Sequence, residues 1–208
     1  MLDELFGLSG KTALITGGGS GIGAMMAHGF AHAGARVIIC SRKLHQVEET
    51  AAQINSSSPS GHIEAFSGDV SSEEGIDAIV TEVNARTNKL NILVNNAGVL
   101  GAGQLFSVTE ENWDHTNSVN LKGPYFLTQA AAKIMVERKT KGRIINVTST
   151  HVYRPSKLYT VYTISKAGLD MLSRSLALEL GEFGITVNSI VPGAVTTAMS
   201  GYHAQPES

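Results

Sequence analysis

The sequence predicts an α/β fold, a doubly wound parallel sheet with helices on both faces, formed as one Rossmann-like domain over residues 1–208. Short apolar runs alternate with longer segments of helical periodicity along most of the chain. The apolar runs lack the strict polar alternation of a sheet with one wet face, so both of their faces are expected to be buried. No repeat or change in composition marks a second domain. Ligands are therefore expected at the carboxyl ends of the strands.

Six apolar runs are predicted as strands, over 12–16, 36–40, 63–66, 90–94, 143–147 and 186–191. Helical periodicity predicts helices over 21–33, 44–54, 72–86 and 159–182. A further long helix is expected to begin at a capping box formed by Ser107 and Glu110 and to reach about Arg138. The polar stretch 55–62 is predicted to be a loop.

Composition narrows the classes of partner. A formal charge of −2 and a pI near 6.4 give no basic field for nucleic acid. Residues 1–10 lack the pattern of a signal peptide, and no run approaches the roughly 18 apolar residues of a membrane span. A cytoplasmic protein without a membrane segment is expected. Cys40 is the only cysteine, which excludes an intrachain disulfide, and His28 with His32 lacks a third ligand, so no metal site is predicted.

The first predicted strand leads into a glycine-rich turn. Residues 16–23 read TGGGSGIG and fit the pattern T-G-x-x-x-G-x-G, with Gly17, Gly21 and Gly23 at the glycine positions. A tight turn that lets the backbone approach a pyrophosphate, followed by a helix N-terminus with free N–H groups, is what dinucleotide binding requires. The alternative interpretation is an ordinary sharp strand-to-helix connection.

The end of the second predicted strand indicates which dinucleotide is bound. A carboxylate there would accept hydrogen bonds from the adenosine ribose and favour NAD. This chain instead has Ser41, Arg42 and Lys43. Two cations without a carboxylate favour a 2′-phosphate, so NADP is predicted over NAD. The alternative is that both cations are merely exposed.

Several motifs follow in a fixed order: Asp69-Val70, NNAG at 95–98, VNLKG at 119–123, IINVTS at 144–149, YTISK at 162–166 and PGAVTT at 192–197. Together with the glycine-rich turn, this ordered set resembles the short-chain dehydrogenase/reductase family of the classical type, from about Leu8 to Thr197. Within that family the chain is most similar to the group of 3-oxoacyl reductases and sugar or polyol dehydrogenases.

The resemblance implies a catalytic tetrad of Asn120, Ser149, Tyr162 and Lys166. Tyr162 and Lys166 are four residues apart and share a helix face. An adjacent ammonium, together with the positive nicotinamide, is expected to stabilise the phenolate and to lower the pKa of the phenol from its ordinary value of about 10, so that Tyr162 acts as general acid and base. Ser149 would hydrogen-bond the substrate oxygen, Lys166 would also hold the nicotinamide ribose, and Asn120 would position a water and Lys166 for proton relay.

The resemblance also implies the cofactor contacts. The expected set is Thr16, Gly17, Ser20, Gly21, Ile22 and Gly23 at the phosphates, Ser41, Arg42, Asp69, Val70, Asn95, Ala97 and Gly98 along the adenosine side, Tyr162 and Lys166 at the ribose, and Pro192, Gly193, Val195 and Thr197 near the nicotinamide.

Tyr153 and Lys157 repeat the Y-x-x-x-K spacing. Pro155 lies between them and disfavours a continuous helix, so this pair is not expected to share a face. We expect Tyr153 to line a substrate pocket with His151 and Arg154.

Members of the family continue for some forty residues beyond the Pro-Gly motif, through a substrate lid and a last strand, whereas this chain ends at Ser208 after a tail that looks frayed from Ser200. The resemblance therefore predicts a sheet without its usual last strand, an exposed sixth strand and a homodimer or homotetramer. The leading hypothesis is an NADP-dependent oxidoreductase that transfers a hydride between cofactor and a ketone, aldehyde or alcohol. The alternatives are a catalytically weak NADP(H)-binding protein, acting as redox sensor or dimerisation partner, and a purely structural protein.

Overall fold

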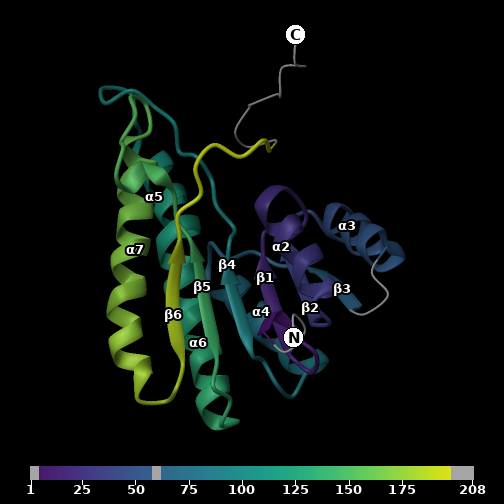
Figure 1. Ribbon diagram of the computed structural model, residues 1–208. Coiled ribbons are helices and arrows are strands. Elements are labelled where there is room, and N and C mark those ends of the chain that lie inside the picture. Colours follow the sequence, from purple (N-terminus) through teal and green to yellow (C-terminus); the bar gives the residue numbers. More distant parts are fainter. Residues whose placement is uncertain (1–4, 58–61, 198–208) are drawn as a thin grey trace.

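The computed structural model describes residues 5–57 and 62–197, which form one parallel six-stranded sheet with helices on both faces (Figure 1). The sheet order is β3-β2-β1-β4-β5-β6, and every neighbouring pair is parallel. The strands are β1 (Thr12–Thr16), β2 (Arg36–Ser41), β3 (His62–Ser67), β4 (Ile92–Asn95), β5 (Arg143–Val147) and β6 (Thr186–Ile190). The predicted doubly wound fold is confirmed, with strand bounds shifted by two residues at most.

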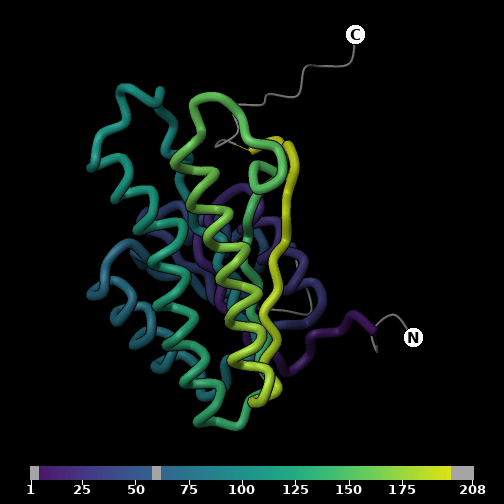
Figure 2. The backbone as a smooth tube through the Cα atoms, turned by 90° about the vertical axis from the view of Figure 1, so that its left-hand side faces the viewer, coloured from purple at the N-terminus to yellow at the C-terminus, as the bar shows by residue number. Residues whose placement is uncertain are grey.

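Two helices, α2 (Gly21–His32) and α3 (Leu44–Ser57), cover one face of the sheet, over β1, β2 and β3. Three others, α4 (Glu73–Arg86), α6 (Gly123–Glu137) and α7 (Thr160–Gly181), cover the opposite face. Figure 2 views the molecule from the side of α7, which lies beside β6. Strand β1 is buried along its whole length because both of its faces meet a helix layer.

The predicted long helix is broken into three pieces. Helix α5 (Glu110–Asn117) is followed by a π-helical turn, η1 (Ser118–Lys122), and then by α6. Pro124 has no N–H to donate to the carbonyl of residue 120, so the α-helical ladder cannot continue there and the turn widens. The predicted capping box is also wrong: Thr109 is the N-cap and its side chain accepts a hydrogen bond from the Asn112 N–H, whereas the Ser107 hydroxyl donates to the Gln104 carbonyl.

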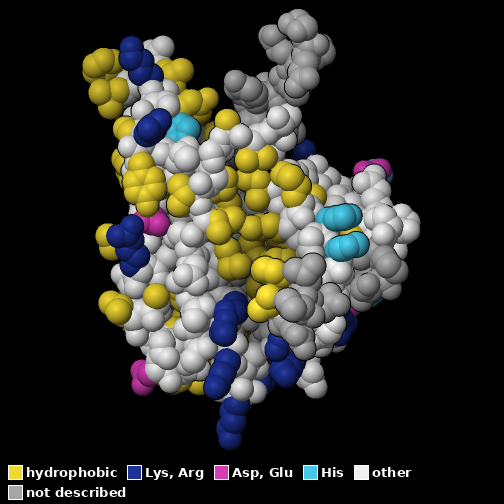
Figure 3. All heavy atoms as spheres, in the orientation of Figure 1, with side chains coloured by type: hydrophobic (Ala, Val, Ile, Leu, Met, Phe, Trp, Pro, Cys, Tyr) yellow, Lys and Arg dark blue, Asp and Glu magenta, His cyan; other side chains and the backbone are white. Residues whose placement is uncertain are grey.

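The two faces of the sheet are covered to different extents. Ile144 and Val187, on the α6–α7 side of β5 and β6, are buried. On the other side of the same strands Ile145 and Ile190 are only partly buried, and no helix of the described ranges lies over them. Figure 3 shows hydrophobic side chains gathered on this face between α2 and β6.

Among the described residues, β6 forms one edge of the sheet and no seventh strand follows it. The tail from Ser200 to Ser208, predicted to be frayed, lies outside the described residues. Of the helices in residues 5–57 and 62–197, none is long and apolar enough to cross a membrane. The same residues contain no group of three or more His, Cys, Asp or Glu side chains able to hold a metal ion.

Candidate active site

A cavity of about 470 Å³ lies at the carboxyl ends of the strands. Its walls come from the turn after β1, the loop after β4, the end of β5, the start of α7 and the segment after β6. The lining residues are Gly17, Ser20, Gly21, Ile22, Asn96, Ala97, Gly98, Leu100, Val147, Thr148, Ser149, Thr150, His151, Tyr159, Tyr162, Lys166, Pro192, Gly193, Ala194, Val195 and Thr197. The position and size are those of a small-molecule site in a doubly wound fold.

The glycine-rich turn forms one end of the cavity. Gly17 adopts φ 66°, and its N–H donates to the carbonyl of Cys40 at 2.8 Å, which ties the turn to β2. A Cβ at position 23 would lie 2.3 Å from the Gly17 carbonyl oxygen, so only glycine lets α2 pack against the turn. Gly23 therefore serves packing and does not line the cavity.

The first turn of α2 presents its free N–H groups to the cavity. Ser20 is the N-cap, its side chain makes no capping hydrogen bond, and the first turn contains no acidic residue. Free backbone donors and the positive end of a helix dipole together favour an anion at this point. The phosphate-binding interpretation of the sequence thus has the geometry it requires.

The two asparagines of the 95–98 motif have different positions, and the sequence interpretation selected the one that points away from the cavity. The side-chain amide of Asn96 donates to the carbonyls of Thr16 and Gly17 at 2.9 and 3.1 Å. The Thr16 hydroxyl in turn accepts hydrogen bonds from the backbone N–H groups of Asn96 and Ala97. Asn96 therefore links the turn after β1 to the loop after β4. The tandem Asn-Asn in the sequence was the signal that could have identified it.

Asn95 lies in the core, with 2% of its surface exposed. Its amide donates to Thr128 on α6 at 2.9 Å and to Asn146 on β5 at 2.8 Å. Asn146 then donates to Ser173 on α7 at 2.8 Å. This chain of hydrogen bonds joins two strands and two helices directly beneath the cavity. The Asn95 side chain is thus fully engaged away from the predicted cofactor contact.

Tyr162 and Lys166 lie together on the first turns of α7. Both are buried, at 8% and 4% exposure, and the Lys166 Nζ atom lies 5.9 Å from the centre of the Tyr162 ring. Lys166 Nζ donates to the Val147 carbonyl at 2.8 Å, which holds the ammonium at the end of β5. Ser149, two residues further along, hydrogen-bonds Tyr162. The structure thus brings three of the four predicted catalytic residues to one wall of the cavity.

Burial changes the acidity of both groups. It raises the pKa of Tyr162 above its ordinary value, and the hydrogen bond from Ser149 lowers it only in part. The expected lowering of this pKa by Lys166 together with a positively charged nicotinamide stays a prediction. Burial lowers the pKa of Lys166 to about 8. At neutral pH Lys166 is still mostly an ammonium ion.

Asn120 lies in η1 and has no exposed surface. Its amide donates to the Val99 carbonyl and to the Ser165 hydroxyl, and its carbonyl oxygen accepts from the Val99 N–H. A Cβ at Gly98 would lie 3.2 Å from Asn120 Oδ1 and 3.4 Å from Lys166 Nζ. Asn120 and Lys166 therefore converge on Gly98 without a direct hydrogen bond, and the predicted water relay stays a prediction.

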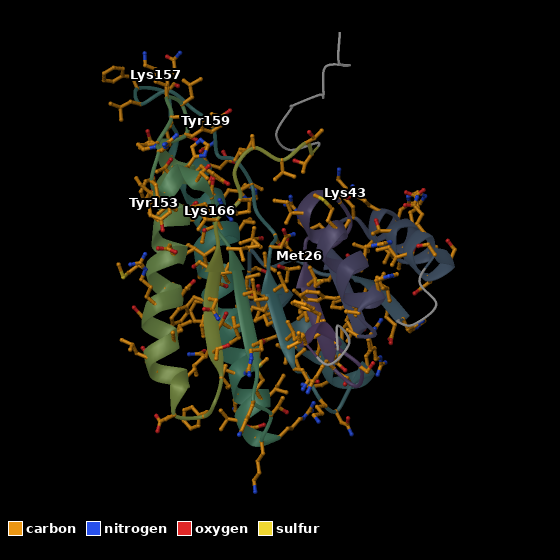
Figure 4. The ribbon with its side chains drawn as sticks, viewed as in Figure 1. Met26, Lys43, Tyr153, Lys157, Tyr159 and Lys166 are labelled. Atoms are coloured by element: carbon orange, nitrogen blue, oxygen red, sulfur yellow. The ribbon has the colours of Figure 1, made fainter. Side chains whose placement is uncertain are left out.

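Of the predicted adenosine-side residues, Ala97 and Gly98 line this cavity, whereas Ser41, Arg42, Asp69, Val70 and Asn95 do not. Ser41 is the last residue of β2 and Arg42 follows it, and the Ser41 carbonyl accepts a hydrogen bond from the Gly68 N–H. Asp69 accepts a hydrogen bond from the Ser71 N–H, while Val70 is buried. Arg42 and Lys43 are exposed and form no ion pair with any residue in the described ranges. Figure 4 shows Lys43 above the α2 side of the sheet and Lys166 above the α7 side.

The second tyrosine–lysine pair does not form a site. Tyr153 and Lys157 precede α7 and share no helix, as Pro155 predicted. Tyr153 is 63% exposed, and neither it nor Arg154 lines the cavity, which corrects that part of the sequence interpretation. His151 does line the cavity, and so does Tyr159, the N-cap of α7, which sequence analysis did not identify (Figure 4).

A parallel doubly wound sheet, a phosphate-binding turn and a buried tyrosine–lysine pair in one cavity define a dinucleotide-dependent oxidoreductase. The short chain dehydrogenase family model matches residues 11–208. The chain belongs to this family.

The relatives that this chain matches are named after several different substrates. Galactitol 2-dehydrogenase from Agrobacterium fabrum is 38% identical over 188 residues, which cover 90% of this chain and 72% of that protein. A solved structure described as an NAD(P)-dependent gluconate 5-dehydrogenase from Beutenbergia cavernae, with NADP at low occupancy, has TM-score 0.87 and 34% identity over 94% of this chain and 76% of that one. A 3-oxoacyl (acyl-carrier-protein) reductase from Agrobacterium tumefaciens with NADP bound has TM-score 0.89 and 32% identity, covering 95% and 75%.

Proposed function

We propose that this chain transfers a hydride between NADP(H) and a carbonyl or alcohol substrate, with Tyr162 as the general acid and base. The observation that carries the proposal is the buried cluster of Ser149, Tyr162 and Lys166, in the same cavity as the glycine-rich turn. Burying an ammonium costs free energy, and a buried ammonium beside a phenol in a cavity is typical of a functional site.

The cavity fits a dinucleotide. The uncapped first turn of α2 offers donors to a pyrophosphate, and the glycines of the turn remove side chains that would fill the space. Ser41 and Arg42 would take a 2′-phosphate, which favours NADP as in the relatives solved with NADP. Lys166 would hold the ribose of the nicotinamide, and the nicotinamide supplies or accepts the hydride when bound.

The residues divide the proton chemistry among them. Tyr162 donates its phenolic proton to the carbonyl oxygen in reduction and takes it back in oxidation. Ser149 donates a hydrogen bond to the same oxygen and stabilises the charge that develops there. Lys166, fixed by Val147, stabilises the phenolate left on Tyr162.

The outer face of α6 and α7 supports a homodimer. A groove of about 410 Å³ lies between these helices, with Tyr125, Val136 and Leu180 among its lining residues. Phe126 and Leu178 on the same helices are exposed, at 41% and 85%. Apolar exposure of this kind marks an association surface, and a second copy of the chain pairing helix against helix would cover it.

The proposed acid–base role is tested by Tyr162→Phe. The variant is expected to lose about a thousandfold in kcat for NADPH-dependent ketone reduction, because the ring remains but its proton does not. Its affinity for NADPH, measured by fluorescence titration, should stay within about threefold of wild type. Turnover of the variant near the wild-type rate would refute the role of Tyr162. Binding of NADPH by the wild type without turnover of any carbonyl would instead support the catalytically weak binding protein.

A further inference from the structure

The cavity wall contains a histidine, His151, that the proposed mechanism does not use. His151 lies two residues after Ser149, in the short 3₁₀ helix η2 (Thr150–Val152). Its ring packs edge to face against both Tyr159 and Tyr162, with centroids 5.5 Å apart in each case. Two aromatic contacts fix the ring in the cavity, directly beside the proposed reacting oxygen.

One nitrogen of the His151 ring is committed to Ser149. Nδ1 lies 3.2 Å from the Ser149 Oγ atom, and the backbone N–H of His151 donates to the same oxygen at 3.2 Å. A serine hydroxyl has one proton to donate and two lone pairs with which to accept. Ser149 is therefore the point at which His151, Tyr162 and a substrate oxygen compete for hydrogen bonds.

The tautomer of His151 decides the outcome of this competition. If Nδ1 carries no proton, it accepts the Ser149 proton, and Ser149 cannot donate to a substrate oxygen. If Nδ1 carries the proton, it donates a hydrogen bond to one lone pair of the Ser149 Oγ atom, and the backbone N–H of His151 donates to the other. The Ser149 proton is then directed outward, to Tyr162 or to the substrate. Of the two neutral tautomers, only the Nδ1–H form is compatible with Ser149 acting as a donor in the reaction.

The same tautomer determines what the other nitrogen can bind. In the Nδ1–H form Nε2 carries a lone pair, and no residue in the described part of the chain donates a hydrogen bond to it. His151 Nε2 is thus a hydrogen-bond acceptor on the cavity wall beside Ser149 and Tyr162. It can accept a hydrogen bond from a substrate hydroxyl on the carbon next to the reacting carbon. A second carbonyl, which offers no proton, does not suit it.

We propose that His151 has two roles, an inference that rests on the proposed function. Its Nδ1–H holds Ser149 as a hydrogen-bond donor, and its Nε2 binds a substrate hydroxyl. The preferred substrates are then α-hydroxy ketones in reduction and vicinal diols in oxidation, in preference to simple ketones and 3-oxoacyl groups. His151 is on this basis a specificity-determining residue of the site.

A matched pair of probes tests the specificity. Acetoin and butanone have the same carbon skeleton and differ only in the neighbouring hydroxyl. The wild type is expected to show kcat/KM at least about tenfold higher for acetoin, because butanone leaves Nε2 unpaired. Ethyl acetoacetate, with an acceptor in place of the hydroxyl, is expected to resemble butanone.

Two variants separate the two nitrogens. The amide of His151→Asn reaches the position of Nδ1, and that of His151→Gln reaches the position of Nε2. His151→Asn should lose the preference for acetoin, because its amide leaves the position of Nε2 empty. His151→Gln should retain a preference for acetoin, and His151→Phe should lose it. A ratio that is the same in all four proteins would overturn the inference.

A second readout needs no turnover. Nitrogen-15 NMR of the histidine rings, assigned with His151→Gln, reports the tautomer directly. We expect Nδ1–H in the free protein and a shift of the Nε2 signal when acetoin is added together with NADP. An Nε2–H tautomer, or no shift, refutes the role of His151. If Tyr162→Phe also turns over normally, the proposed function itself fails; if turnover needs Tyr162 and only the His151 results are negative, this inference alone fails.

Discussion

One half of the sheet carries the glycine-rich turn, and the other half carries the cluster of Ser149, Tyr162 and Lys166. On the α2–α3 face of the sheet, apolar side chains of the first half are buried more completely than those of the second. On the α2–α3 side Ile15 in β1 and Ile39 in β2 have no exposed surface. Ile145 in β5 and Ile190 in β6 point to the same side and are only partly buried. On the opposite side both halves are closed, since Ile144 is as fully buried as Ile15. The cofactor turn therefore rests on a core closed on two sides.

The half with Tyr162 and Lys166 also carries buried polar contacts on its closed α6–α7 side. The hydrogen bonds from Asn95 through Asn146 to Ser173 join β4, β5 and α7 beneath the cavity. Buried polar networks that are fully satisfied specify a single arrangement, even where apolar packing is less complete. The two halves thus fix their functional groups by different means: packing under the turn, and hydrogen bonding under Tyr162 and Lys166.

The largest expected difference between the halves concerns apolar packing. Ile15→Ala should lower the free energy of unfolding by about 3 to 4 kcal/mol, because it opens a cavity in a closed core. Ile145→Ala, on the same face, should cost only about 1 kcal/mol, because its side chain already reaches solvent. Urea unfolding at pH 7 measures both. Equal losses would show that the two halves are equally covered.

A second difference concerns the buried charge in the catalytic half. The pKa of Lys166 is about 8 in the folded protein against an ordinary value of 10.5, so between these pH values the unfolded chain binds more protons than the folded one. Stability then rises with pH across this window. Relative to Lys166→Met, the wild type should gain about 2 kcal/mol in free energy of unfolding between pH 7 and pH 9.5. The variant lacks the titrating group and should lack this gain.

Above pH 10 the raised pKa of Tyr162 acts in the opposite direction, because the folded state then retains the phenolic proton. Urea unfolding at pH 7, 8.5 and 9.5 therefore isolates Lys166. Parallel pH profiles for wild type and Lys166→Met would mean that Lys166 carries no burial penalty.

The smallest expected effect lies at the cofactor half. Arg42→Ala should lower the preference for NADPH over NADH by about tenfold, or about 1.4 kcal/mol, because it removes a charge-assisted contact with a 2′-phosphate. Fluorescence titration with each cofactor measures the ratio. Lys89→Ala, an exposed lysine just before β4 at the other end of the sheet, should leave the ratio unchanged. If Arg42→Ala leaves the ratio of the NADPH and NADH affinities unchanged, Arg42 does not explain a preference for NADP.

Local signals predicted the fold and much of the site. Apolar runs without alternation specify buried strands, and the spacing of Tyr162 and Lys166 places both on one face of a helix whatever surrounds it. The break in the long helix was not predicted, although Pro124 was visible, because apolar periodicity continues across it. The core position of the Asn95 side chain was not predicted either, because alternate residues of a strand point to opposite faces and the sequence does not say where the strand ends. The contact of Asn95 with the cofactor stays a prediction.

The sequence by itself determined the parallel sheet, the phosphate-binding turn and the pairing of Tyr162 with Lys166, since each depends on residues close together in the chain. Only the tertiary structure decided that Lys166 is held by Val147, that Asn95 belongs to the core and that the His151 ring packs on Tyr162. It also showed that burial raises the pKa of Tyr162. Burial and hydrogen bonding depend on groups brought together from separate strands and helices, and no local pattern specifies which atoms meet there.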